Sequence, residues 1–223
     1  MIKRCTIAVF CALMSAQAAQ AGAWLRDPGR SFVSSSITAT QAGDGSSSTY
    51  LEYGLNDRLT LGADVFFAFD RFGNQGGYGT LFLRLPLGST DRPNKWAIDV
   101  GGGAAWLGGE VLPHLKTGLS WGRGYRLRQR AGWIAVDASV FWDLTYSRHV
   151  AKLDTTVGLA LGDHVKAMMQ VFYASVDGVG TTTYAPSLLI EPGRGTYSLQ
   201  VGVEMPAGDY GDPSLKLGVW RRF

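Results

Sequence analysis

The chain is built mainly from short stretches in which apolar and polar side chains alternate. The clearest example is residues 50–69, where two alternating runs meet at a two-residue turn, Asn56-Asp57. Side chains of a β-strand point alternately to opposite faces. Leu61 and Val65 therefore share one face, while Asp64 lies on the other. This pattern predicts a β-hairpin with one apolar and one polar face.

Most of the remaining sequence repeats the same unit, and no segment matches a helical period. An even number of alternating segments of about ten residues is typical of a closed transmembrane barrel. The predicted fold class is therefore all-β: a transmembrane antiparallel up-and-down β-barrel of about 12 strands. The predicted strands are residues 31–40, 50–55, 58–69, 77–87, 95–106, 112–122, 132–142, 150–161, 165–174, 181–191, 195–205 and 214–223. Residues 42–48 are expected to form a loop, and the basic run 123–130 a connection.

Residues 1–21 have the order of a secretory signal peptide. Lys3 and Arg4 precede a short apolar run, and small residues end at Ala21, which predicts cleavage before Gly22. A transmembrane anchor is the alternative, but the apolar run is well short of the ~20 residues that a spanning helix needs. The predicted organisation is a signal peptide at 1–21 and one outer-membrane barrel domain at 22–223. Both cysteines lie in the signal segment, so the mature chain is expected to lack thiols.

Alternation alone also fits a soluble barrel or sandwich, in which the apolar face would point inward. The C-terminal stretch LKLGVWRRF favours a membrane barrel, because it ends on Phe223 with apolar residues at alternate positions before it. It resembles the terminal-strand signal that the outer-membrane assembly machinery recognises. Arg221 departs from this signal, although its charge can reach water at the bilayer edge. The expected location is the outer membrane of a Gram-negative bacterium.

Aromatic residues on the apolar faces predict the depth of the membrane. Trp96 and Trp106 lie on one face of the same strand, ten residues apart. At ~3.3 Å per residue and a ~45° tilt, this separation matches the ~25 Å apolar band of outer-membrane barrels. The alternative is a pair of surface tryptophans in a soluble sandwich. The predicted girdle, in contact with outer-membrane lipids and lipopolysaccharide, comprises Trp96, Trp106, Trp121, Trp142, Tyr173 and Tyr197.

The opposite faces carry charges of both signs and are predicted to line the barrel interior. Twelve strands enclose a space between the filled interior of eight-stranded barrels and the wide channel of porins with sixteen. The charges fit a narrow passage for a small solute, or they pair across the interior and close it. The predicted lumen-lining residues are Glu52, Asp64, Arg84, Asp99, Lys116, Asp137, Lys152, Asp154, Lys166, Gln170 and Glu204.

A lipid-modifying outer-membrane enzyme is the competing function. Ser147 and His149, near Asp143 and Asp154 in sequence, are the best candidates for a nucleophile and base. The expectation is nevertheless that the protein is not an enzyme and has no cofactor. The three histidines lack metal-ligand spacing, and no clustered basic surface predicts a nucleic-acid partner. Glycines 101–103 precede no helix, so they are expected to permit close packing instead of binding phosphate.

The hairpin YLEYGLNDRLTLGADV resembles a loose group of proteobacterial outer-membrane proteins, several described as transporters of aromatic-degradation (phenol) pathways. In that group an EYGL-turn-RLTLG hairpin follows a short first strand. The resemblance implies a small barrel with an uptake role, and it implies no catalytic residue. Together with the inner charges, it leads to the expectation of a narrow pore or uptake channel for small solutes. A lipid-modifying enzyme and a closed structural barrel remain the alternatives.

Overall fold

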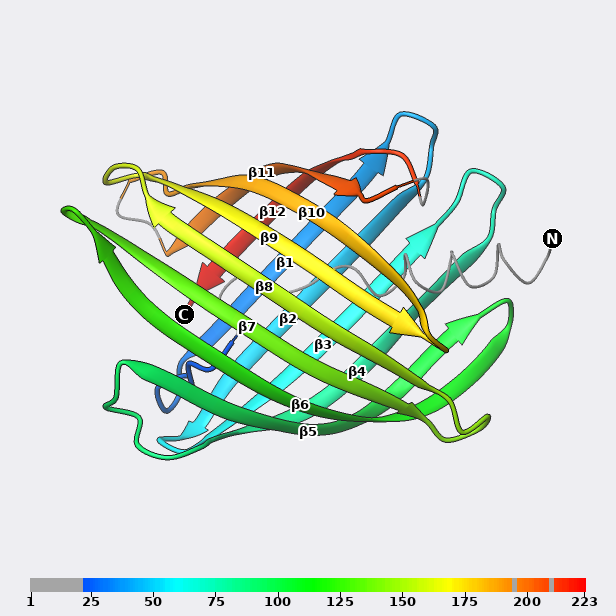
Figure 1. Ribbon diagram of the computed structural model, residues 1–223, viewed down its shortest axis with the longest axis horizontal. Coiled ribbons are helices and arrows are strands. Elements are labelled where there is room, and N and C mark those ends of the chain that lie inside the picture. Colours follow the sequence, from blue (N-terminus) through cyan, green and yellow to red (C-terminus); the bar gives the residue numbers. More distant parts are fainter. Residues whose placement is uncertain (1–21, 194–195, 209–210) are drawn as a thin grey trace.

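The computed structural model describes residues 22–193, 196–208 and 211–223, which form a tilted, twelve-stranded barrel (Figure 1). The predicted signal peptide lies outside the described residues. The strands are β1 (Ser31–Thr40), β2 (Gly45–Asn56), β3 (Leu59–Phe69), β4 (Gln75–Pro86), β5 (Asn94–Leu107), β6 (Glu110–Leu127), β7 (Arg130–Asp143), β8 (His149–Ala160), β9 (Val165–Val176), β10 (Val179–Ile190), β11 (Tyr197–Pro206) and β12 (Ser214–Arg222).

Every strand pairs antiparallel with its neighbours in sequence, and β1 pairs with β12 to close the sheet. The closing register runs from Phe32 opposite Arg222 to Thr40 opposite Ser214. A closed sheet leaves no row of unpaired backbone groups, which is the condition for β-structure in a bilayer. The predicted fold class is confirmed. Across the described residues, no helix has the length and apolar character needed to cross a membrane.

Two predicted connections were wrong because they continue as strands. The serine-rich stretch expected as a loop belongs to β2, which begins at Gly45, and Ser46 pairs with Thr38 on one side and Ala68 on the other. Pairing on both sides outweighs the weak strand preference of glycine and serine. The arginine-rich run is also largely strand, since β6 extends to Leu127 and β7 starts at Arg130.

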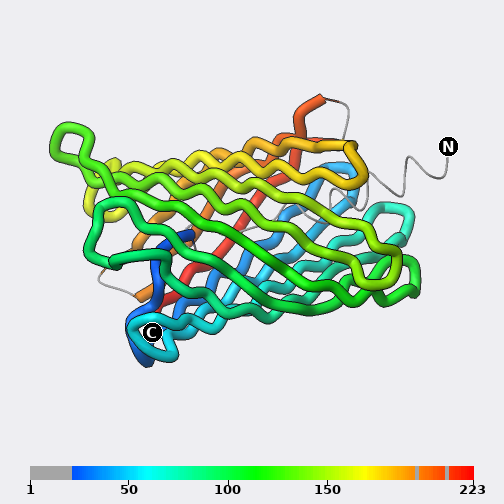
Figure 2. Tube along the Cα trace, turned by 60° about the horizontal axis from the view of Figure 1, so that its bottom comes forward, coloured from blue at the N-terminus to red at the C-terminus, as the bar shows by residue number. Residues whose placement is uncertain are grey.

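The barrel has two distinct ends, visible along its long axis in Figure 2. We call the one where β1 begins and β12 ends the terminal end, and the opposite one the loop end. The fully described connections at the loop end are short, from two residues at 108–109 to five at 70–74. None of these is long enough to fold deeply into the barrel.

The outward face carries a continuous set of exposed apolar side chains. Leu81 is 63% exposed and Val100 57%, each in the middle of its strand, and Leu115 on β6 is 51% exposed. An apolar surface of this kind on all sides belongs in lipid, since soluble monomers rarely expose large apolar patches. The soluble alternative, which would place these residues inside, is therefore wrong.

The inward face combines polar groups with two clusters of buried aromatic residues. One cluster includes Phe66, Tyr78 and Phe141, and the other includes Tyr50 and Phe82. A Cβ added at Gly62 would overlap the Phe82 ring, and one added at Gly101 would overlap the Leu81 carbonyl oxygen and the Cβ of Phe82. The expected role of the 101–103 run in close packing therefore fits the structure.

Candidate functional site in the barrel interior

All eleven residues predicted to line the interior occupy the alternate strand positions whose side chains point into the barrel. Eight are almost completely buried inside the barrel: Glu52, Asp64, Arg84, Asp99, Lys116, Lys152, Gln170 and Glu204. Asp137, Asp154 and Lys166 are half-buried. The strands thus bring charges that are distant in sequence into one enclosed space.

A connected series of ion pairs lies along one side of the interior. Arg84 forms two hydrogen bonds to Asp99, Nε to Oδ1 at 2.7 Å and Nη2 to Oδ2 at 2.8 Å. Its Nη1 also lies 2.5 Å from Oε1 of Glu52, which accepts a further hydrogen bond from the Tyr50 hydroxyl. Lys116 Nζ lies 3.9 Å from Asp99. Such pairing keeps buried charges compensated.

A second group of interior charges forms no such close ion pairs among the described residues. Asp137 on β7 lies directly opposite Asp154 on β8, and one carboxylate oxygen of each has no hydrogen-bond partner. One carboxylate oxygen of Asp64 accepts a hydrogen bond from the Tyr78 hydroxyl at 3.2 Å, and the other oxygen has no hydrogen-bond partner. Lys152 lies 5.7 Å from the ring centres of Tyr78 and Phe141. Within the described residues it forms no ion pair with a carboxylate.

The remaining predicted interior residues form local pairs. Lys166 Nζ donates to Glu191 Oε1 at 2.7 Å near the terminal end, and Lys216 Nζ donates to Glu204 Oε1 at 2.8 Å. Burial raises the pKa of Glu191, which lies just beyond β10, but the hydrogen bond and charge of Lys166 outweigh this and leave that pKa below its usual range. These two ion pairs stabilise contacts between neighbouring strands. The group around Lys152 remains the set of interior charges that form no ion pair within the described part of the chain.

The segment before β1 also belongs to the interior, which the sequence did not reveal. Arg26 Nε lies 2.5 Å from Glu52 Oε2, and its backbone N donates to Thr60 Oγ1 at 3.0 Å. The Trp24 indole lies against Gly122 on β6, where an added Cβ would overlap it. The segment therefore crosses the interior at the terminal end, from the β2–β3 side to β6. The only sequence signal was a tryptophan and an arginine in an otherwise unpatterned lead-in.

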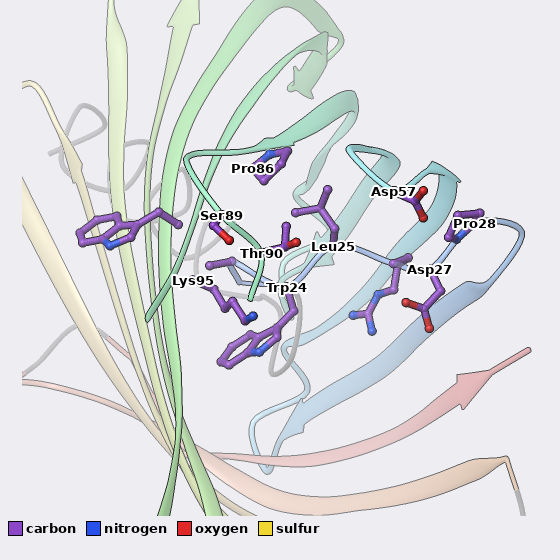
Figure 3. Close-up of a pocket in the computed structure, with 12 residues that line it drawn as sticks. Trp24, Leu25, Asp27, Pro28, Asp57, Pro86, Ser89, Thr90 and Lys95 are labelled. Carbon is purple, nitrogen blue, oxygen red and sulfur yellow. The ribbon is translucent and has the colours of Figure 1, made fainter. Parts of the chain in front are cut away.

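This crossing segment borders a pocket of about 440 Å³ at the terminal end, shown in Figure 3. Trp24, Leu25 and Asp27 line one side, and Ser89 from the β4–β5 connection and Lys95 at the start of β5 line the other. The pocket marks the space left between the crossing segment and the barrel wall.

The predicted girdle residues lie near both ends of the barrel. Trp96 and Trp121 pair across β5 and β6 with ring centres 6.4 Å apart. Trp96, Trp142, Tyr173 and Tyr197 are exposed, and Trp106 and Trp121 are half-buried. By position along their strands, Trp96, Trp121 and Tyr197 lie toward the terminal end, and Trp106, Trp142 and Tyr173 toward the loop end.

Phe223, the predicted assembly signal, continues the pairing of β12 with β1. Its backbone N donates to the Ser31 carbonyl at 3.0 Å, and its ring is exposed on the outside. The Arg221 guanidinium lies 4.3 Å from the centre of that ring. The departure from the resembled signal thus places a cation beside the terminal aromatic ring.

The residues proposed for lipid chemistry do not form a catalytic arrangement in the structure. His149 is exposed, and its ring packs on Trp142 with centres 5.9 Å apart. Ser147 lies in the turn with a positive φ of 54°. Among residues 22–193, 196–208 and 211–223, neither side chain forms a hydrogen bond to the other or to an acid. The same residues contain no group of three or more His, Cys, Asp or Glu placed to hold a metal ion.

Arg71 joins three connections at the loop end. It donates to Asp44 from Nη2 at 2.7 Å and from its backbone N at 2.8 Å, and to Asp212 at 2.9 Å. These hydrogen bonds hold the pKa of Asp44 below its usual range. The short loops are therefore tied together around one cation.

No family model matches the chain, and no curated protein sequence matches it. Solved structures do resemble it. The KdgM porin has a TM-score of 0.60 at 8% identity, covering 86% of this chain and 99% of that one. The COG4313 outer membrane channel from Pseudomonas putida F1 has a TM-score of 0.54 at 14% identity, covering 93% and 100%. LpxR from Salmonella typhimurium has a TM-score of 0.57 at 9% identity, covering 86% and 99%.

The fold shared with these proteins is that of a small outer-membrane β-barrel. The expected location in the Gram-negative outer membrane agrees with all three, and the lipid-facing apolar surface described above fits the same environment. The chain therefore has the architecture of a small Gram-negative outer-membrane β-barrel.

Proposed function

We propose that the protein is a narrow pore that lets small polar solutes cross the outer membrane. The observation that carries this proposal is a group of interior charges that form no ion pair among the described residues, Lys152 with Asp64, Asp137 and Asp154. Structural ion pairs elsewhere in the barrel are closely matched, as in the contacts of Arg84 with Glu52 and Asp99. Buried charges that form no close ion pair inside a barrel are costly unless water or a solute meets them.

The sign and surroundings of these charges suggest the class of solute. A cation flanked by carboxylates offers complementary contacts to a molecule that carries both signs, or to a neutral molecule with several polar groups. Small zwitterionic or polar solutes fit this environment better than large or strongly charged ones.

The neighbouring structures and the hairpin resemblance support a transport role. One of the similar structures is described as the KdgM porin in complex with disordered oligogalacturonate, and another as an outer membrane channel. The resemblance to transporters of phenol-degradation pathways also implies uptake, although it rests on one hairpin. Both point to passage through the barrel, and the interior charges favour a polar solute over a phenol.

We further propose that the terminal end faces the periplasm. β1 begins and β12 ends there, so a barrel assembled from the periplasmic side by the outer-membrane assembly machinery would keep these two strand ends on that side. The loop end, with its Arg71 contacts, would then face lipopolysaccharide and the cell exterior.

Single-channel conductance of the refolded protein in a planar bilayer tests the pore. A steady conductance is expected in the native protein, with altered size and ion preference in Lys152→Ala and Asp154→Ala. Arg58→Ala, in an exposed turn outside the interior, is the control and should conduct like the native protein. Absence of conductance from correctly folded protein would refute the pore and favour the closed structural barrel.

A further inference from the structure

We propose that signal-peptide removal creates an ion pair inside the barrel, between the new α-ammonium group of Gly22 and the facing carboxylates of Asp137 and Asp154. This would fasten the crossing segment at its free end. The inference rests on the predicted cleavage before Gly22, and it is independent of whether the barrel conducts solutes.

Gly22 lies close to the carboxylate of Asp137. Gly22 and Ala23 are buried, and Gly22 lies against β7. A Cβ placed on Gly22 would lie 3.1 Å from the Cβ of Ala135 and 3.5 Å from Oδ2 of Asp137. The amino nitrogen is attached to the same Cα as that Cβ, so a local rotation brings it to hydrogen-bond distance of the carboxylate.

The carboxylates of Asp137 and Asp154 are the acceptors. Asp137 and Asp154 occupy directly opposed positions on β7 and β8, where like charges are unfavourable. Each has an oxygen that is shielded from solvent and has no hydrogen-bond partner. Lys152 is the nearest interior cation on β8, but its ammonium group lies over the rings of Tyr78 and Phe141. Among the described residues, neither carboxylate forms an ion pair with a lysine or arginine, and the charge of Lys152 acts on Asp154 only from a longer distance.

The other end of the crossing segment is already fixed. Arg26 pairs with Glu52, and Gly29 N donates to the carbonyl of Gly54 at 2.8 Å. Between these contacts and Gly22, the Trp24 ring packs on Gly122. An ion pair at Gly22 would therefore fix the second end of the crossing segment, which runs from β2 to β7.

The chemistry of cleavage supplies the missing charge. Hydrolysis of the Ala21–Gly22 peptide bond adds one water molecule, leaving a carboxylate on Ala21 and an amine on Gly22. An α-amine has a pKa of about 7.7–8.0 in model peptides, so it takes up a proton at neutral pH. An amide nitrogen in the uncleaved chain carries no such charge, so the ion pair would form only after processing.

Amine labelling of the mature protein tests this proposal. Protein isolated from outer membranes is treated at pH 7 with a limiting amount of an acetylating reagent, and the N-terminal peptide is quantified by mass spectrometry. Gly22 is expected as the first residue, and its amine should react about tenfold more slowly than in Asp137→Asn/Asp154→Asn, corresponding to a bond of about 1.4 kcal/mol. Asp143→Asn, at the loop end of β7, is the control and should protect the amine like the native chain.

A second protein, refolded with one alanine added before Gly22, leaves the barrel unchanged and moves the amine away from its acceptors. It should be labelled as fast as the double variant, which guards against loss of folding in that variant. A mature chain that starts elsewhere would overturn the proposal, as would equal labelling of the native protein and both altered forms. Because labelling requires no solute flux, these results are distinct from failure of the pore.

Discussion

Glu52 on β2 and Arg84 on β4 form an ion pair across the inner face of β3, with Oε1 and Nη1 2.5 Å apart. The strand between them carries Gly62 opposite Glu52 and Thr60 opposite Arg84, so only small side chains separate the two charged groups. The pair ties three strands together from inside, and the contact of Arg26 with Glu52 adds the crossing segment.

Removing the Arg84 charge should destabilise the barrel strongly. Arg84→Ala leaves Glu52 and Asp99 buried with much less compensation, and breaking a buried pair in this way typically costs about 3–5 kcal/mol. Urea unfolding of the protein refolded in lipid vesicles, followed by tryptophan fluorescence, measures the change. Arg58→Ala in the exposed β2–β3 turn is the matched control and should change stability by less than about 0.5 kcal/mol. Equal effects of both changes would contradict the structural role of Arg84.

The lipid-facing surface predicts that the same substitution has different effects at different depths. Val100 lies mid-strand on the outside of β5, whereas Val111 is near the loop end of β6; they are 57% and 67% exposed. Val100→Arg should cost about 2–4 kcal/mol in vesicles, and Val111→Arg about 0–1 kcal/mol. Urea midpoints of the two variants give the comparison. A soluble barrel would tolerate arginine equally at both exposed sites.

Close packing of Phe82 on Gly62 predicts a coupled pair of substitutions. A Cβ at Gly62 would overlap the Phe82 ring, so Gly62→Ala should cost about 1–3 kcal/mol through overpacking. In a Phe82→Leu background the added methyl group should cost clearly less, because the ring that it meets is gone. A double-mutant cycle of unfolding free energies tests this coupling. Strict additivity would show that Gly62 is needed for some other reason.

The Asp44–Arg71 contact predicts a pH-dependent stability difference at the loop end. Hydrogen bonds from Arg71 hold the pKa of Asp44 below its usual range, so the folded state binds fewer protons than the unfolded state in acid. Its stabilisation is therefore complete above pH ~4 and is lost as the pH falls through the lowered pKa. The native protein should be more stable than Asp44→Asn at pH 7, with the gap narrowing toward pH 2.

Urea unfolding at both pH values measures that gap. Arg148→Ala removes an exposed and longer ion pair, with Nε 3.6 Å from Asp177, and should show little effect at either pH. A gap between native protein and Asp44→Asn that is unchanged at pH 2 would rule out the contribution of ionised Asp44.

Much of this architecture could be predicted from the sequence because a barrel wall obeys a strict period of two. That period placed Leu61 outside and Asp64 inside without knowledge of any contact. The sequence could not show where strands end when a neighbouring strand continues to pair, as at Gly45 and Leu127. Nor could it show which interior charges form ion pairs, since Glu52 contacts Arg26 and Arg84 only in the folded barrel. The crossing segment has no period at all, so its place in the interior depends entirely on tertiary contacts.

The crossing segment predicts that Trp24 limits passage at the terminal end. Its indole fills the space above Gly122, inside the barrel wall. If the barrel is a pore, Trp24→Ala should raise its single-channel conductance, because the cross-section for water and ions grows where the ring is removed. Trp121→Ala is a suitable control, since it removes a tryptophan side chain from the outer face of β6, the strand of Gly122, and leaves the interior unchanged. An increase in both variants would indicate a general loosening of the barrel, whereas an increase in Trp24→Ala alone would place the narrowest point at the crossing segment.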